Sequence, residues 1–288
     1  MKQRRFSMIT LGLLLLIHPI PMLFHTVAVG LFALLAGWPA LAWSTLGLVV
    51  AAHMAMQLSI AVLNDYCDRH LDAVAKPGKP IPRGLIHPGE ALVLGLLLII
   101  VMLLLLLPLP PLALLVSLLY LALGMAYNLR LKATPWSGVV FALAMPLIPL
   151  YAFVAMGREL PMFFWLLPVA ALLGVALNLS NSLPDLEEDA RQNARTLAVA
   201  LGVRRSFLIC PLLILLSMVL IAVQGALYQL PDRAWILLPA LAVAGVAVIA
   251  MFAFFGPRKP RQTRKLYFYL VVMICLVLAA GWLSGVIT

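Results

Sequence analysis

Charged residues are scarce in this chain of 288 residues: Asp, Glu, Lys and Arg make up 10% of it, whereas 65% of its residues are hydrophobic. A soluble globular domain carries about 25% charged and roughly 45–50% apolar residues. The deficit excludes a soluble enzyme, a disordered chain and a secreted disulfide scaffold. The net charge is +10, but no basic face stands clear of the apolar segments, so we do not expect nucleic acid as a partner.

Cysteine is also rare. Cys67, Cys210 and Cys275 lie far apart, and two of them fall inside apolar runs. This spacing implies neither a disulfide framework nor a cysteine-based metal site. Long apolar segments are what the chain has in excess, so we interpret it as a polytopic membrane protein with the lipid bilayer as its surroundings.

Nine apolar segments are long enough to cross a membrane as helices, because each crossing needs about 20 mainly apolar residues. The expected spans are residues 8–35, 40–63, 89–107, 111–129, 136–156, 161–182, 205–227, 233–255 and 266–286. The first has an apolar stretch too long for a signal peptide, and no small-residue cleavage site follows it. We therefore expect an all-α fold, with residues 1–288 forming a single membrane-embedded domain.

The basic residues predict the orientation of these spans. All but Arg158 and Arg233 of the 20 Lys and Arg residues fall before span 1 or in the loops 2–3, 4–5, 6–7 and 8–9, which share one side in a nine-span topology. An excess of Lys and Arg marks the cytoplasmic side. We expect a multi-pass protein of the cell (inner or plasma) membrane, with its N-terminus in the cytoplasm.

The few acidic residues are grouped: seven of the ten lie in two short clusters, both expected in cytoplasmic loops. The first cluster follows span 2 and occupies residues 64–72. Asn64, Asp68 and Asp72 step by four, so they form one stripe if the helix continues. Asp65 borders the same face. This end of span 2 is therefore expected to present several oxygen ligands together.

The second cluster, residues 185–189, lies just beyond span 6. Asp185 and Asp189 also step by four, and Asn178 and Asn181 extend their line back into the span. The two clusters therefore direct oxygen ligands from helix ends toward a common cytoplasmic level.

Such grouping of like charges indicates a bound cation, because carboxylates four residues apart repel each other. Oxygen ligands without paired His or Cys suit a hard ion such as Mg²⁺, which proteins usually bind through one or two carboxylates and substrate phosphates. Basic residues follow each cluster, as a diphosphate site would require: Lys76, Lys79, Arg83, Arg191 and Arg195. The alternative is a set of solvated loop charges, which we expect for Glu187 and Glu188.

At these residues the sequence resembles the UbiA superfamily of intramembrane prenyltransferases. Residues 64–72 match the family's N-D-x-x-D-x-x-x-D motif completely, and residues 76–84 match its R-x-x-R-P-x-x-x-G stretch with lysine for arginine twice. The second motif, D-x-x-x-D followed by T-L-x-x-x-x-G, is matched by residues 185–189 and 196–202. The resemblance implies a UbiA-like bundle of nine transmembrane helices with the N-terminus inside.

The resemblance also implies Mg²⁺-dependent transfer of a prenyl group from a polyprenyl diphosphate to a hydrophobic acceptor of aromatic, tetrapyrrole or lipid type. Ionisation of the diphosphate would give an allylic cation, which the acceptor captures. The implied metal residues are Asn64, Asp68, Asp72, Asp185 and Asp189. The implied substrate-binding residues are Lys76, Lys79, Arg83, Arg195 and Asn181. The implied catalytic residues are Asp65, Tyr127 and Lys132, the last two through a loosely matched Tyr-x-x-x-Lys element.

Some positions depart from the family pattern. Ser182 stands where some relatives carry an aspartate, Asn193 and Ala194 replace the usual Gly and Lys, and His18-Pro19 replaces an Arg-Pro. These changes concern the diphosphate contacts and the acceptor, and they keep a non-catalytic relative as one alternative.

An ion-coupled transporter is the other alternative, because acids within membrane spans often mark ion paths. Transporters usually place ion ligands near the midplane on broken helices. Here the acids gather at the cytoplasmic ends, which favours the enzyme. Three histidines within the spans, His18, His25 and His53, are expected to be hydrogen-bonded interior residues, and Gln57 is a candidate for the same cavity as Asn64.

Overall fold

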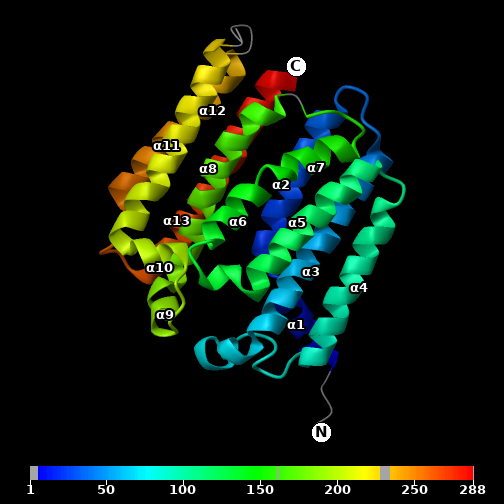
Figure 1. Cartoon of the computed structure of the whole chain (residues 1–288), viewed down its shortest axis with the longest axis vertical. Helices are drawn as coiled ribbons and strands as arrows, with labels where there is room; N and C mark the ends of the chain where they lie inside the picture. The colour runs from blue at the N-terminus through cyan, green and yellow to red at the C-terminus, as the bar shows by residue number, and fades with distance from the viewer. Residues whose placement is uncertain (1–5, 161, 228–233, 288) are drawn as a thin grey trace. The chain divides into compact units, whose positions relative to one another are not determined.

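The computed structural model describes residues 6–160, 162–227 and 234–287, and every regular element in these ranges is helical (Figure 1). The first half contains α1 (Phe6–Leu16), α2 (Pro19–Gly37), α3 (Trp43–Ala75), α4 (Pro88–Leu106), α5 (Pro111–Leu129), the 3₁₀ helix η1 (Leu131–Ala133), α6 (Ser137–Ala144) and α7 (Leu147–Ala155). The second half contains α8 (Phe163–Ser182), the 3₁₀ helix η2 (Leu183–Asp185), α9 (Leu186–Arg191), α10 (Leu197–Leu201), α11 (Val203–Leu227), α12 (Ala234–Phe254) and α13 (Arg261–Ile287).

Within the described ranges, nine helical segments are long and apolar enough to cross a membrane, and this confirms the predicted number of spans. Four of the basic residues that predicted the orientation lie outside the described residues: Lys2, Arg4, Arg5 and Arg233.

The first predicted span, 8–35, is wrong as a single helix. The chain leaves the helix after Leu16 and starts a new one at Pro19, and His18 between them has a left-handed backbone with φ of 48°. A residue that precedes proline is disfavoured in the right-handed helical conformation, and proline is well suited to the first turn of a helix. The candidate span is therefore α2, preceded by the shorter apolar helix α1.

The fifth predicted span, 136–156, is interrupted where α6 gives way to α7. Pro146 lies at the interruption and has no N–H to donate to the preceding turn. The proline therefore accounts for the break between α6 and α7.

Span 2 is longer than predicted. The helix α3 runs for 33 residues, or about 50 Å, whereas the hydrocarbon core is about 30 Å thick. The first acidic cluster, residues 64–72, therefore lies on the helix, and the expectation that it occupies a loop is wrong. The helix ends at Ala75, since Pro77 disfavours a helical conformation for Lys76.

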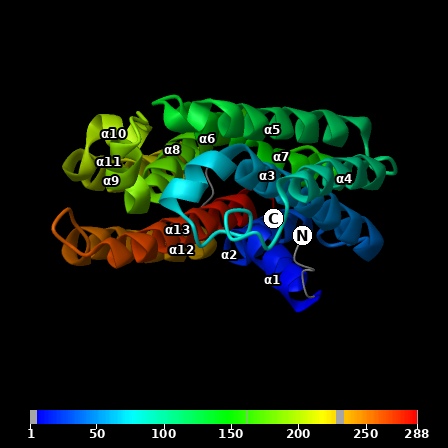
Figure 2. The same ribbon diagram turned by 90° about the horizontal axis from the view of Figure 1, so that it is seen from below.

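Residues up to Leu129, together with Tyr151–Arg158, form one compact unit. Its central helix is α3, which packs against α2, α4 and α5; Figure 2 shows this part of the chain from below. Gly95 of α4 faces Leu63 so closely that any larger residue would collide with that side chain, so the two helices are in tight contact. The helix α1 and the loop after α3 pack against α3 and α4 through one hydrophobic core, formed by Leu16, Val62, Ile81, Ile86 and Ala91.

The second unit comprises residues 130–150 and the chain from Glu159 onward. Its central helix is α8, which packs against α6, α11 and α13, while α12 packs against α13. Gly174 of α8 lies against the backbone of Phe141 in α6, where a side chain has no room. These contacts fix the C-terminal end of α8, from which the second acidic cluster continues.

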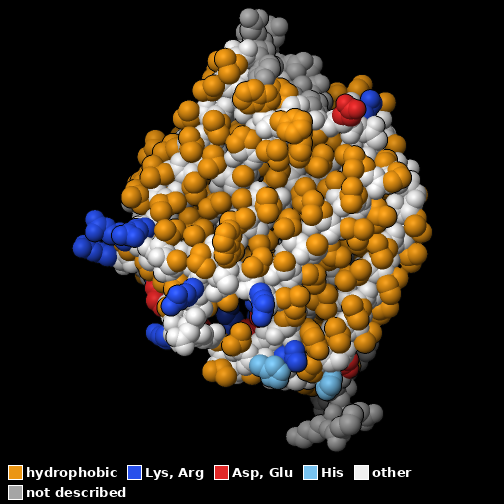
Figure 3. All heavy atoms as spheres, viewed as in Figure 1, with side chains coloured by type: hydrophobic (Ala, Val, Ile, Leu, Met, Phe, Trp, Pro, Cys, Tyr) orange, Lys and Arg blue, Asp and Glu red, His pale blue; other side chains and the backbone are white. Residues whose placement is uncertain are grey.

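Apolar side chains dominate the surface, as Figure 3 shows for one face. Large exposed hydrophobic residues occur in both units, including Leu97 and Leu115 in the first and Leu212 and Ile249 in the second. Extended apolar surface of this kind marks contact with another apolar phase, and here the bilayer supplies it.

Candidate active site

The last turns of α3 carry the first acidic cluster on one face. Asp65 and Asp72 are buried, and Asn64 and Asp68 are half-buried. The predicted stripe at steps of four is present because the helix continues to Ala75. Four oxygen-bearing side chains are therefore held on a regular backbone.

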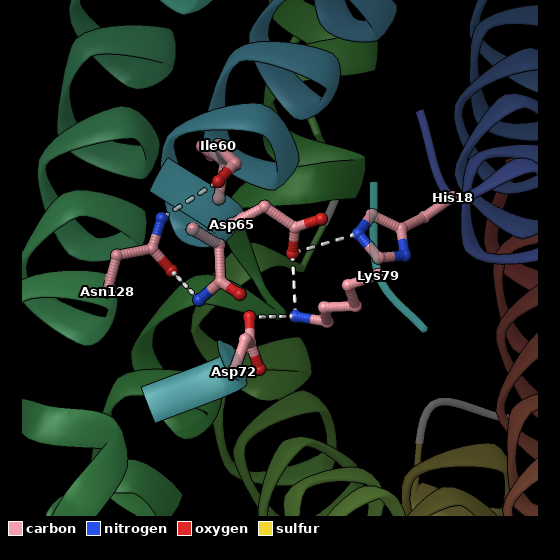
Figure 4. A network of polar contacts seen from close by, with 7 residues as sticks. His18, Ile60, Asp65, Asp72, Lys79 and Asn128 are labelled. Atoms are coloured by element: carbon pink, nitrogen blue, oxygen red, sulfur yellow. Dashed lines mark hydrogen bonds and ion pairs between the residues drawn. The ribbon is translucent and has the colours of Figure 1, made fainter. Parts of the chain in front are cut away.

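Lys79 lies between two of these carboxylates (Figure 4). Its Nζ donates to Asp65 Oδ1 and to Asp72 Oδ2, both at 2.7 Å. The loop after α3 returns the lysine to the helix through a turn in which the Arg83 N–H donates to the Lys79 carbonyl at 3.1 Å. Burial lowers the pKa of Lys79, but the charges and hydrogen bonds of the two carboxylates raise it more, to a net value above the ordinary one. The side chain is therefore an ammonium ion.

Asp65 has a second partner, His18, whose Nε2 lies 3.3 Å from the same Oδ1 atom. His18 lies at the break between α1 and α2, and Figure 4 shows its ring facing Asp65. The other oxygen, Oδ2, is buried and has no hydrogen-bond partner among the described residues. His18 is thus hydrogen-bonded, as expected, and Asp65 is the most enclosed carboxylate of the motif.

Asn64 is oriented by a residue that the sequence analysis did not single out. Its Nδ2 donates to Asn128 Oδ1 at 2.9 Å, and Asn128 Nδ2 donates to the Ile60 carbonyl at 2.8 Å (Figure 4). The amide nitrogen of Asn64 therefore faces α5, and its carbonyl oxygen is directed elsewhere. The sequence offers one signal that could have identified Asn128, namely a single amide side chain near the end of the otherwise apolar span 4.

The second acidic cluster is built on a change of helix. The helix α8 ends at Ser182, the 3₁₀ turn η2 follows, and α9 begins at Leu186. Asp185 is the residue before α9, with φ −105° and ψ 3°, and both Asp185 and Asp189 are half-buried. Asp185 thus has a bridge-region backbone, a conformation that many active-site residues adopt.

The sequence predicts that Glu187 is a solvated charge, and the structure corrects this prediction in part. Its Oε2 accepts a hydrogen bond of 2.7 Å from Nη1 of Arg264 in α13, although its side chain remains 47% exposed. The same guanidinium nitrogen donates to the Leu183 carbonyl at 3.0 Å. Glu188 is half-buried.

The two asparagines of span 6 differ. Asn178 is fully buried, and its Oδ1 accepts from Ser137 Oγ at 3.2 Å, so it joins α8 to α6. Asn181 is exposed.

The remaining predicted residues are distributed over both units. In the first, Lys76 and Tyr127 are half-buried and Arg83 is exposed. In the second, Lys132 is half-buried in η1, and Arg195 has an exposed side chain while its backbone N–H donates to the Ala133 carbonyl at 2.9 Å. Each unit therefore carries one acidic motif with cations near it in sequence.

No group of three or more Asp, Glu, His or Cys side chains is gathered closely enough to hold a metal ion within the described ranges. The donors are nevertheless of the type that Mg²⁺ prefers, since Asn64, Asp68 and Asp72 present amide and carboxylate oxygens along one face. The buried Oδ2 of Asp65, which lacks a donor, is a further oxygen on this helix. The residues of the first motif therefore fit Mg²⁺.

A second group of polar side chains lies deeper in the first unit. Gln57 Nε2 and His53 Nε2 are 3.2 Å apart, and the rings of His25, Tyr120 and Tyr151 lie 5.5–5.7 Å from that of His53. Tyr151 donates to the Val49 carbonyl at 2.9 Å. His53 is the hydrogen-bonded interior residue that the sequence predicted.

Comparison with known proteins supports the family resemblance that the sequence motifs indicate. Residues 22–284 match the model of the UbiA prenyltransferase family. The chain is 32% identical over 216 residues to the digeranylgeranylglyceryl phosphate synthase of Natronomonas pharaonis. The aligned residues cover 73% of this chain and 75% of that protein. The chain is also 30% identical over 195 residues to the 4-hydroxybenzoate octaprenyltransferase of Vibrio vulnificus, with 65% and 67% covered.

A solved structure has the same fold. The UbiA homolog from Archaeoglobus fulgidus bound to GPP and Mg²⁺ matches with a TM-score of 0.74 at 18% sequence identity, covering 95% of this chain and 99% of that one. The likeness extends over nearly the whole of both chains.

Proposed function

The chain belongs to the UbiA prenyltransferase family, and from this premise we propose that it transfers a prenyl group from a polyprenyl diphosphate to a hydrophobic acceptor in a Mg²⁺-dependent reaction. The observation that carries the proposal is the arrangement on α3. Buried carboxylates and an ammonium group meet there at the end of an otherwise apolar helix.

The metal residues that we propose are Asn64, Asp68, Asp72, Asp185 and Asp189. Bound Mg²⁺ would neutralise charge on the diphosphate and so favour its departure. The hydrogen bond to Asn128 holds the nitrogen of Asn64 away, which leaves a carbonyl oxygen as the end suited to a hard cation. On the second motif, the proposal rests on the sequence pattern and on the half-buried carboxylates of Asp185 and Asp189.

The cations that we propose for diphosphate binding are Lys76, Lys79, Arg83 and Arg195, with Asn181 as an amide donor. Lys79 is the best supported, because it is half-buried and charged beside the motif. An ammonium group has three N–H donors, of which two reach Asp65 and Asp72, so one remains for a phosphate oxygen.

Asp65, Tyr127 and Lys132 are proposed as catalytic residues. Asp65 fixes Lys79 and His18 through one oxygen, and its buried Oδ2 suits a proton donor on the acceptor. Tyr127 precedes Asn128 on α5, and Lys132 follows in η1. The phenol ring offers a face for a developing cation, and the ammonium offers a donor for the leaving group.

The acceptor class is the open part of the specificity. The relatives named above are a digeranylgeranylglyceryl phosphate synthase and a 4-hydroxybenzoate octaprenyltransferase, so their names indicate different acceptors. We propose a cytoplasm-facing site in a cell membrane, based on the distribution of Lys and Arg.

The test is Mg²⁺-dependent release of diphosphate from radiolabelled geranylgeranyl diphosphate by purified protein, with a panel of aromatic, tetrapyrrole and glycerol-lipid acceptors. Asp68→Ala and Asp185→Ala should each abolish turnover, and Glu159→Gln, an exposed acid outside both motifs, is the matched control. Turnover that needs Mg²⁺ and both aspartates supports the proposal, and the panel identifies the acceptor. Well-folded protein that neither binds nor cleaves the donor would overturn it and favour the ion-coupled transporter or a non-catalytic relative.

A further inference from the structure

A buried arginine from α13 reaches the second motif. Arg264 is 6% exposed, and its Nη1 donates to the Leu183 carbonyl at 3.0 Å and to Glu187 Oε2 at 2.7 Å. Its Nε is buried without a hydrogen-bond partner among the described residues. From sequence alone Arg264 is only one of the many basic residues expected on the cytoplasmic side.

The two acceptors belong to opposite sides of one junction. Leu183 directly follows α8, where the last carbonyls have no partner within the helix and a cation is favourable. Glu187 is in the first turn of α9, where an anion is favourable. One guanidinium therefore links the end of α8 to the beginning of α9.

Asp185 lies midway between these two contacts. It is two residues after Leu183 and two before Glu187, and its backbone is in neither regular helix. Leu183 and Leu186 are buried, so the junction is anchored by apolar packing as well as by Arg264. This local backbone sets the direction in which the Asp185 side chain leaves the chain.

The arginine itself is firmly placed. One turn later on α13, Tyr267 is fully buried, with its ring 4.9 Å from that of Phe207 and 5.3 Å from that of Phe255. The helix α13 also packs directly against η2 and α8. The guanidinium is thus a fixed point to which the junction is tied.

We propose that Arg264 is a positioning residue for the second motif: by capping Leu183 and pairing with Glu187, it holds Asp185 in the orientation needed to bind the metal. The inference rests on the proposed role of Asp185 in Mg²⁺ binding. Arg264 itself touches no substrate in this scheme, and it acts only through the backbone on either side of Asp185.

The experiment uses the full chain in nanodiscs and measures the Mg²⁺ midpoint, which is the Mg²⁺ concentration that gives half-maximal binding of geranyl diphosphate. This midpoint is compared between wild type and each variant. Arg264→Gln should raise this midpoint by about 10–100-fold, the usual cost of losing a group that orients a metal ligand. Arg264→Lys, which keeps the charge but not the fork of donors, should recover part of the loss. Glu187→Gln should give a smaller shift, because the Leu183 contact remains.

The matched control is Trp282→Phe, which removes another buried polar link of α13, the 2.8 Å hydrogen bond from Trp282 Nε1 to Gln224 Oε1. This variant should lose thermal stability but keep the Mg²⁺ midpoint within about twofold of wild type, since Trp282 lies about 27 Å along the helix from Arg264. A midpoint for Arg264→Gln no higher than that of Trp282→Phe would overturn the inference.

Hydrogen exchange of residues 183–191 provides a readout that needs no substrate. Arg264→Gln should speed exchange in this segment and Trp282→Phe should not. If wild-type protein shows no Mg²⁺-dependent binding, the proposed function fails, and exchange alone then decides on the backbone role: unchanged exchange in Arg264→Gln overturns it, and faster exchange supports it.

Discussion

The two acidic motifs of this chain are built in different ways. The first lies on the uninterrupted helix α3, and its carboxylates meet a lysine from the loop that follows directly. The second lies where α8 gives way to α9, and it is tied by a hydrogen-bonded arginine from a helix some 80 residues later. The first motif is thus organised by side-chain charge on a regular backbone, and the second by anchoring of an irregular backbone.

This difference separates two kinds of failure. Loss of Lys79 removes the ammonium donor that two buried carboxylates share, so the first unit should lose stability. Loss of Arg264 removes a donor from the Leu183 carbonyl and from Glu187, whose side chain is already 47% exposed, so the main effect should be on backbone geometry. Variants of Lys79 therefore test how charge balance stabilises the first motif, and variants of Arg264 test how the backbone of the second motif is held in position.

The largest expected effect comes from matched substitutions at the last aspartate of each motif. Asp72→Asn and Asp189→Asn should each reduce Mg²⁺-dependent turnover of geranylgeranyl diphosphate more than about 100-fold, because loss of a ligand exceeds the cost of losing a group that orients one. Single-turnover rates measure the effect. Near-normal turnover in one variant would show that its motif does not bind the metal.

Lys79→Met should lower the free energy of unfolding by about 1–3 kcal/mol, since Asp65 and Asp72 lose their shared donor. Mg²⁺ should restore part of this stability, because it supplies the missing positive charge, and should stabilise the variant more than wild type. Thermal unfolding in EDTA and in Mg²⁺ tests both points, with Lys79→Arg as the charge-preserving control. Equal unfolding temperatures for Lys79→Met and wild type in EDTA would contradict the charge-balance account.

Asn128→Leu should raise the Mg²⁺ midpoint for diphosphate binding by about tenfold, because the amide of Asn64 loses the group that orients it. Ser117→Ala, at another buried polar residue of α5, is the control for general perturbation of that helix. Identical midpoints in the two variants would argue against a metal role for Asn64.

The smallest effect is expected at the helix that follows the second motif. Thr196 caps α10 by accepting a hydrogen bond of 3.2 Å from the Val199 N–H. Thr196→Ala should cost about 1 kcal/mol of stability, and Thr196→Ser should cost less. A denaturant titration of both variants checks this; equal stability would show that capping contributes little to the order of this region.

Much of the fold follows from local sequence. Apolar length predicted the nine spans, and steps of four predicted the stripe from Asn64 to Asp72, because both depend on helix geometry alone. The break at His18 was missed although the His-Pro pair was visible, since the length of the apolar run outweighed it. The length of α3 was also missed, because hydropathy marks the apolar part of a helix and not its polar continuation.

Contacts between distant segments could not be predicted. Asn128 is 64 residues from Asn64, and Arg264 is 77 residues from Glu187, so neither pair leaves a spacing signal. Lys79 was predicted as a diphosphate cation, but its position between Asp65 and Asp72 required the return of the loop after α3. Sequence identified which residue types matter, and tertiary packing determined their partners.

The central proposal is that each motif is required for Mg²⁺-dependent binding of a prenyl diphosphate, and a binding titration tests it most directly. Radiolabelled geranylgeranyl diphosphate would be titrated onto the purified chain, with and without Mg²⁺, for wild type, Asp68→Ala and Asp185→Ala. We predict saturable binding that requires Mg²⁺ and is lost in both variants. Binding of equal strength without Mg²⁺, or in either aspartate variant, would contradict the account.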